Sequence, residues 1–300
     1  MKLGLHTYSL YLHGIGQNWA GFKLPWEREL STFELLELGV ELGLDGFHLD
    51  DGVLESLDPS FLSEVKAAAR SHDLFLEYNM SLDLGGFGIG IQHDIQAGVH
   101  TAHALGADVV KVGMEIPRPR PRAGSRFHKA VMPYLQDTAR QLKAAAPLAE
   151  SFNIRLALEN HCDSFSEEIL WTLNQVDHSH VGACIDTMNA WYVAEDPMAA
   201  IENLAPMAFT NHFRDDRIKF TRDGFKVCGG AVGDGDIDMK KAYQLIKEQA
   251  PGNRIIIETE TGFSLDDKDE ALTLEIETVK KSITYCRKVL KIGRGEAAQR

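Results

Sequence analysis

Short runs of apolar, often β-branched residues alternate with longer amphipathic stretches along the whole chain. The short runs predict strands at Leu3–Tyr8, Gly46–Asp50, Leu74–Asn79, Asp108–Met114, Ile154–Glu159, Val181–Asp186, Met207–Phe213 and Arg254–Glu258. The longer stretches predict helices such as Thr32–Leu42, Pro59–His72, Ile95–Leu105, Lys129–Phe152, Glu167–Leu173, Lys240–Gln249 and Glu270–Leu290. Eight strands alternating with helices predict an α/β fold, a single (β/α)8 TIM barrel.

No shift in composition divides the chain into separate domains. We therefore expect residues 1–290 to form one barrel and residues 291–300, which are small and polar, to form a flexible tail. An additional hairpin is expected near Lys219–Cys228, after the seventh strand.

Four predicted strands in the second half each end in a residue of a type that binds metals. These residues are Glu159, Asp186, His212 and Glu258, and consecutive ones are 27, 26 and 46 residues apart. In a parallel barrel the carboxyl ends of all strands meet at one rim, so these side chains converge there. Three carboxylates and one imidazole suit a hard or borderline divalent cation. Glu260 shares the parity of Glu258, but Glu258 ends the apolar run and is the preferred fourth ligand.

Other polar residues are expected at the same rim. His6 is expected to form part of the pocket wall, and Arg217, or its neighbour Arg214, to bind a substrate hydroxyl or carboxylate. Asp215 is expected at the rim as a substrate-binding residue or one that orients His212, with a simple turn role as the alternative. His161 follows Glu159 by two residues and therefore shares its face. It is either a catalytic base, or a group that orients Glu159 or forms a hydrogen bond to the substrate.

Arg118, Arg120, Arg122 and Arg126 form the one basic run, directly after the fourth predicted strand. The run is either an anion-binding lid over the active site, or a solvated loop or subunit contact.

Composition excludes several partners. The formal net charge is −13, which disfavours nucleic acid and anionic membranes as partners. No segment is apolar for long enough to span a membrane, and the four cysteines are widely spaced. We expect a cytoplasmic protein with reduced thiols that acts on a small molecule. A homo-oligomer is compatible with these features.

The chain resembles the xylose isomerase-like TIM-barrel superfamily, in the branch of sugar phosphate isomerases and epimerases that includes D-tagatose 3-epimerase and inosose dehydratase. The resemblance rests on the Glu, Asp, His, Glu series, on His212-Phe-Arg-Asp and on Gly233-Asp-Gly-Asp-Ile-Asp. It implies that Glu159, Asp186, His212 and Glu258 hold one divalent metal, usually Mn²⁺, with Mg²⁺, Co²⁺ and Zn²⁺ as alternatives. It also implies that Glu159 and Glu258 act as the catalytic acid and base on a carbohydrate.

Two positions depart from the ketose 3-epimerases of this superfamily. Those enzymes have a substrate-contacting histidine three residues after the aspartate ligand, where this chain has Asn189. They have a glutamate six residues after the first ligand, where this chain has Phe165. Asn189 also breaks the histidine pattern of the apurinic endonucleases, so a DNA-repair function is disfavoured. We keep Asn189 as a candidate substrate-binding residue.

The expected chemistry is Lewis-acid activation of a sugar carbonyl. A cation that chelates a carbonyl and the adjacent hydroxyl acidifies the α C–H bond and stabilises an enediolate. The sequence therefore predicts a metal-dependent isomerase or epimerase acting on a ketose or keto-sugar. The alternative is a lyase or dehydratase acting on a keto-sugar, a 3-keto-glycoside or an inosose, which His161 and the two departures favour.

Overall fold

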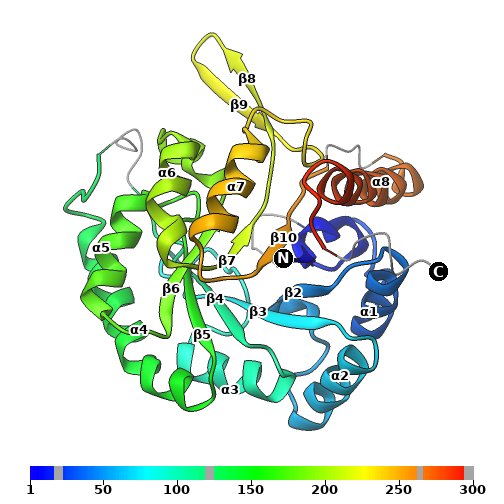
Figure 1. Ribbon diagram of the computed structural model, residues 1–300, viewed down its shortest axis with the longest axis horizontal. Coiled ribbons are helices and arrows are strands. Elements are labelled where there is room, and N and C mark those ends of the chain that lie inside the picture. Colours follow the sequence, from blue (N-terminus) through cyan, green and yellow to red (C-terminus); the bar gives the residue numbers. More distant parts are fainter. Residues whose placement is uncertain (17–22, 119–124, 262–265, 294–300) are drawn as a thin grey trace.

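Eight parallel strands form the centre of the computed structural model, in the order β10-β1-β2-β3-β4-β5-β6-β7 (Figure 1). The structure describes residues 1–16, 23–118, 125–261 and 266–293. The barrel strands are β1 (Lys2–His6), β2 (Gly46–Asp50), β3 (Phe75–Ser81), β4 (Val109–Gly113), β5 (Arg155–Glu159), β6 (Val181–Asp186), β7 (Ala208–His212) and β10 (Arg254–Ile257). All eight predicted strands are therefore confirmed, with ends that differ by at most two residues.

The sheet closes between β7 and β10. The Phe213 amide donates to the Ile256 carbonyl over 2.7 Å, and the Glu258 amide donates to the Phe213 carbonyl over 3.3 Å. Because the first and last edges of the sheet meet, the strands form a barrel and the predicted TIM-barrel fold is confirmed.

Helices cover the outside of this barrel (Figure 1). They are α1 (Thr32–Glu41), α2 (Pro59–Ser71), α3 (Ile95–Leu105), α4 (Met132–Ser151), α5 (Ser166–Val176), α6 (Pro197–Leu204), α7 (Met239–Gln249) and α8 (Lys268–Lys288). Local sequence fixes where several of them begin. Ser31 and Glu34 form a capping box at α1, and Asp94 and Asp238 accept backbone amide hydrogen bonds at α3 and α7. Short 3-10 helices lie in the loops, among them η2 (Tyr11–His13) after β1.

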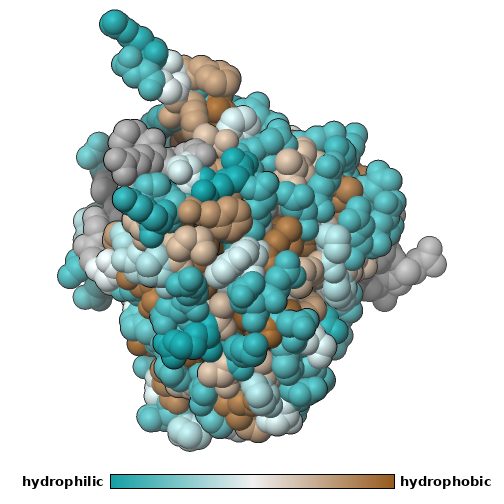
Figure 2. Space-filling model, turned by 90° about the vertical axis from the view of Figure 1, so that its left-hand side faces the viewer, coloured by the Kyte–Doolittle hydropathy of each residue, from teal (hydrophilic) through white to brown (hydrophobic). Residues whose placement is uncertain are grey.

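The predicted hairpin after β7 is confirmed as β8 (Arg217–Thr221) and β9 (Gly224–Cys228). It projects from the body of the molecule in both overall views (Figures 1 and 2). Phe220 at its tip is 82% exposed.

The two faces of the strands separate as the period-two pattern requires. Leu156 and Leu158 of β5 join the large core between strands and helices. Ala157 and Cys184 lie in a separate small cluster with Val109, inside the barrel. Polar side chains fill the rest of the interior, and this places charged groups at the carboxyl ends of the strands.

A register shift in β6 decides which residues face each other at the rim. Ala183 pairs with Ala208, but Cys184 pairs with Thr210, so the register moves by one residue between Ala183 and Cys184. Asp186 consequently lies opposite His212.

Among the described helices, none is long and apolar enough to cross a membrane.

Candidate metal centre and active site

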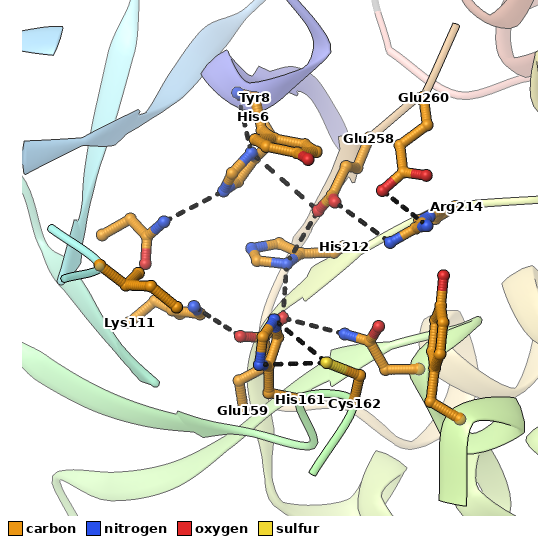
Figure 3. A pocket seen from close by; sticks show the side chains of 14 residues that line it. His6, Tyr8, Lys111, Glu159, His161, Cys162, His212, Arg214, Glu258 and Glu260 are labelled. Carbon is orange, nitrogen blue, oxygen red and sulfur yellow. Dashed lines mark hydrogen bonds and ion pairs between the residues drawn. The ribbon is translucent and has the colours of Figure 1, made fainter. Parts of the chain in front are cut away.

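A pocket of about 280 Å³ lies at the carboxyl ends of the strands (Figure 3). Most of the residues that line it are polar, and they come from five strands (β1, β3, β4, β5 and β7) and from loops that follow the strands. The lining residues are His6, Tyr8, Asn79, Ile89, Lys111, Glu159, His161, Cys162, Asn189, Tyr192, His212, Arg214, Glu258 and Glu260. Three of the four predicted ligands line this pocket, and Asp186 lies directly beside it.

His212 is the centre of the acidic cluster (Figure 3). Its Nδ1 lies 2.9 Å from Glu159 Oε1, 3.0 Å from Glu258 Oε2 and 3.9 Å from Asp186 Oδ2. All four side chains are at most 7% exposed. The structure therefore brings together the four residues that the sequence analysis selected as ligands.

Burial and charge act differently on the carboxylates of the cluster. Burial is the main cause that raises the pKa of Asp186 to about 7, and the nearby Glu258 acts in the same direction. Burial opposes protonation of His212, but Cys184, Glu159 and Glu258 raise its pKa well above the usual value. Three carboxylates in one buried site need nearby positive charge to ionise together, and His212 and Lys111 of β4 supply part of it.

The donor set fits a divalent cation. Asp186 Oδ2 is buried and has no hydrogen-bond partner among the described residues. Asp186 Oδ1 accepts from the amides of Met188 (2.7 Å) and Asn189 (2.8 Å), which fixes the carboxylate so that Oδ2 faces the cluster. One ligand atom from each of Glu159, Asp186 and His212 lies within 4.8 Å of the other two. Oxygen-rich sites with one imidazole are typical of Mn²⁺, Mg²⁺ or Zn²⁺.

Glu258 and Glu260 occupy different places. Glu258 points at His212, whereas Glu260 Oε1 lies 2.9 Å from Arg214 Nη2 and is 36% exposed. Arg214 is buried and also contacts Asp216, with 2.8 Å from Nε to Oδ2. The geometry therefore favours Glu258 over Glu260 as the fourth ligand, and Glu260 as the partner of Arg214.

His161 lines the pocket with its side chain 30% exposed. Its Nδ1 lies 3.7 Å from Glu115 Oε1 and 3.6 Å from Cys162 Sγ. Glu115 follows β4, is buried, and has a φ of +48°. His161 contacts these groups rather than Glu159, so the structure offers no hydrogen bond through which it would orient that ligand.

His6 and Asn189 lie in the pocket, as expected of substrate-binding residues. His6 Nδ1 accepts from the Tyr8 amide over 3.1 Å, and its Nδ1 is also 4.0 Å from Glu258 Oε2. The Asn189 side-chain amide donates to Glu159 Oε1 over 3.5 Å. Both side chains therefore contact the acidic cluster and face the space that a substrate would fill.

Asp215 and Arg217 do not lie in the pocket, and their prediction as substrate-binding residues is corrected here. The Asp215 carboxylate accepts from the amides of Gly233, Gly235 and Ile237 over 2.9–3.1 Å, so it holds the loop after β9. Arg217 begins β8, is exposed, and donates to the Asp234 carbonyl. The turn role considered for Asp215 is the one that its contacts support, because its acceptor capacity goes to backbone amides.

The basic run does not present Arg118 to the pocket as a free cation. Arg118 is buried and pairs with Glu168, while Arg126 pairs with Glu167 over 2.5 Å. Arg120 and Arg122 lie outside the described residues.

Comparison with known proteins adds the family. The model of the xylose isomerase-like TIM barrel family matches residues 36–288. The chain belongs to the xylose isomerase-like TIM barrel family. A 3-oxo-isoapionate decarboxylase of Pectobacterium atrosepticum is 24% identical over 291 residues, which cover 95% of this chain and 94% of that protein.

Two solved structures have the same fold. A structure of D-psicose 3-epimerase in the presence of D-fructose has a TM-score of 0.65 and 14% identity, and covers 97% of this chain and 99% of that one. A structure of IOLI protein with a bound zinc atom has a TM-score of 0.62 and 16% identity, and covers 95% and 98%.

Lys111 is a charged pocket residue that the sequence-based prediction missed. It lies on β4, is 3% exposed, and its Nζ is 2.5 Å from Glu159 Oε2. The signal was available, since a lysine stands between Val110 and Val112 in an apolar strand. A buried lysine needs an anionic partner, and Glu159 has the same interior parity on the adjacent strand.

Proposed function

We propose that this protein is a divalent-metal-dependent sugar-modifying enzyme that acts on a small oxo sugar acid and cleaves a carbon–carbon bond, as a decarboxylase does. The observation that carries the proposal is the ion pair between Lys111 and Glu159. Membership of the family supports carbohydrate chemistry, and the modest size of the pocket suits one small sugar.

Glu159, Asp186, His212 and Glu258 would hold the cation. When bound, the cation supplies Lewis acidity that polarises a carbonyl and stabilises the negative charge of an enediolate. His6 and Asn189 are proposed to bind substrate hydroxyls beside this centre, because both lie in the pocket within 4.0 Å of a ligand carboxylate.

Lys111 makes Glu159 a weak base. Burial raises the pKa of Glu159, but Lys111 and His212 outweigh it and hold the pKa well below the usual value. The Glu258 carboxylate is likewise stabilised by positive groups. His212 Nδ1 lies 3.0 Å from its Oε2, and Arg214 Nη1 lies 3.7 Å from its Oε1. A carboxylate bound in this way accepts a proton from a C–H bond poorly.

Decarboxylation needs no such base. The bond between the carboxylate carbon and the α carbon breaks, CO₂ leaves, and the electron pair of that bond enters the adjacent carbonyl to give the enediolate. Protonation at the α carbon then gives the ketose. His161 is the proposed proton donor, since it lines the pocket, is partly exposed to solvent and is not a proposed ligand.

Two further observations agree with this assignment. Phe165, at the position of the epimerase glutamate, is fully buried and packs against Arg118 and Arg126, so this position does not reach substrate. The relative named as a decarboxylase matches almost the full length of the chain.

Isomerisation or epimerisation of a ketose is the second candidate. Glu159 and Glu258 come from separate strands, β5 and the end of β10, and lie on either side of His212 (Figure 3). That arrangement would let one carboxylate remove a proton and the other return it on the opposite face.

One incubation distinguishes the two reactions. The Mn²⁺-loaded protein is incubated in D₂O with 3-oxo-isoapionate, D-fructose and D-psicose, and the mixtures are followed by NMR and by CO₂ release. CO₂ release with one deuterium in the ketose product supports the decarboxylase. Deuterium in recovered or epimerised ketose, without CO₂, supports the isomerase.

The metal centre is tested independently by metal analysis. Glu159→Gln and Asp186→Asn should lose most of the bound metal, whereas the matched control Glu260→Gln should retain it. Wild-type metal content in both ligand variants would refute the site.

A further inference from the structure

A buried polar network inside the barrel has no part in the proposed reaction. His48 of β2 and Glu77 of β3 are both 0% exposed, and His48 Nδ1 lies 2.9 Å from Glu77 Oε2. Glu77 also accepts from the Thr210 hydroxyl over 2.6 Å and from Arg254 Nη1 over 3.0 Å. Fully buried charge of this kind is costly, so its position next to the metal centre calls for a function.

The contacts of Glu77 fix the hydrogen-bond direction at His48. Burial raises the pKa of Glu77, but His48, Arg254 and Thr210 outweigh it and lower the pKa to about 2. Glu77 is therefore a carboxylate, which only accepts hydrogen bonds. His48 Nδ1 must then carry the proton, and this leaves Nε2 as the position that can accept.

Two imidazole nitrogens on neighbouring rings lack a partner by distance and angle. They are His48 Nε2 and His212 Nε2, both buried and without a hydrogen-bond partner among the described residues, although the Cys184 thiol also interacts with the His212 ring. The two rings are perpendicular, with an interplanar angle of 88° and centroids 4.9 Å apart. One ring nitrogen of each lies within 4.8 Å of one of the other.

His6 is a weaker candidate for the same partnership. Its ring centroid is 4.3 Å from that of His212, but its Nδ1 accepts from the Tyr8 amide and its Nε2 lies 3.2 Å from the Asn79 amide nitrogen. Because its Nδ1 accepts, a neutral His6 carries its proton on Nε2 and has no nitrogen left to accept from His212, whereas His48 has one.

We infer that His48, held by Glu77, is a positioning residue that accepts the Nε2–H proton of His212 and thereby keeps the His212 Nδ1 lone pair directed at the metal centre. Histidine ligands commonly donate their second N–H to such a partner, which fixes the tautomer and the ring orientation. The inference rests on the proposed metal function of His212. It assigns a role to a pair of residues that lies wholly outside the pocket wall.

The test compares Co²⁺ affinity, measured by competition with a chelator, in wild type and variants. His48→Leu should weaken Co²⁺ binding about 10–100-fold. His48→Gln should largely restore it, because its amide can accept from His212 and donate to Glu77. His180→Leu is the control, since His180 donates only to the Ile154 carbonyl away from the site, and its affinity should be unchanged. Equal affinity in folded His48→Leu and wild type would overturn the inference.

A second measurement needs no variant. Long-range ¹H–¹⁵N correlation of the Zn²⁺-loaded wild type should show His48 protonated at Nδ1 and His212 protonated at Nε2. Protonation of His48 at Nε2 would overturn the inference. If the wild type binds neither Co²⁺ nor Zn²⁺, the metal centre itself fails. If it binds both and His48→Leu binds equally well, only the role of His48 fails.

Discussion

Replacement of Lys111 by methionine tests the ion pair on which the proposed function depends. The change removes an ammonium group 2.5 Å from Glu159 Oε2 and keeps a side chain of similar length. At an effective dielectric constant of about 20, two unit charges at this distance attract by about 7 kcal/mol. Desolvation of both groups offsets part of that energy, and the removal of one partner from a buried pair typically costs about 3–5 kcal/mol.

We therefore expect Lys111→Met to lower the free energy of unfolding of the metal-free protein by about 3–5 kcal/mol at pH 7. The measurement is urea unfolding with a chelator present. Addition of Mn²⁺ should reduce the loss, because the cation then neutralises Glu159.

A double-mutant cycle with Glu159→Gln provides the control. In Glu159→Gln alone, Lys111 becomes an unpaired buried charge. The loss of unfolding free energy in the double variant should therefore be about 2 kcal/mol smaller than the sum of the losses in the two single variants. Simple additivity, or a loss below about 1 kcal/mol as found for exposed pairs, would refute the reasoning.

The remaining predictions concern other residues. Glu258→Gln should remove most of the bound metal, and metal analysis that shows full occupancy would contradict its assignment as fourth ligand. Asp215→Asn should lower the free energy of unfolding by about 2–4 kcal/mol, because it weakens three hydrogen bonds to a carboxylate, while Arg217→Ala should leave kcat/KM unchanged. Burial raises the pKa of Asp50 to about 7, so its contribution to stability is fully present below pH 4 and is lost as pH rises from about 4 to 7. In Asp50→Asn, the free energy of unfolding measured with urea should lack this decline between about pH 4 and 7. Parallel pH profiles of the variant and the wild type would contradict the prediction.

Much of the fold follows from local pattern. Apolar runs and amphipathic stretches fixed the eight strands and most helices, because side-chain period depends on backbone geometry within each element. Strand parity also selected Glu159, Asp186 and His212, since residues at strand ends on the interior face can point only to the common rim. The helix α6 was absent from the predicted set, because Pro197–Leu204 spans barely two turns and shows little periodicity.

Parity alone could not separate residues that share it. By that rule Glu258 and Glu260 are equivalent. They differ because β10 ends at Ile257 and because Arg214, which follows β7, forms an ion pair with Glu260. Asp215 lies in the same His212-Phe-Arg-Asp motif as the proposed ligand His212. Its carboxylate nevertheless accepts hydrogen bonds from backbone amides about 20 residues further along the chain. No local pattern encodes which backbone amides a carboxylate will meet.

By itself, the sequence determined the barrel and the rim at which its polar side chains meet, and it selected the candidate cation ligands, because periodicity within single strands decides which residues face that rim. Only the tertiary structure decided the chemistry of that rim. The pairing of Lys111 with Glu159, the alignment of Asp186 with His212 through a shift in register, and the approach of His48 to His212 all join residues from different strands. Such contacts depend on register and on barrel closure, and these are settled when the whole sheet packs together.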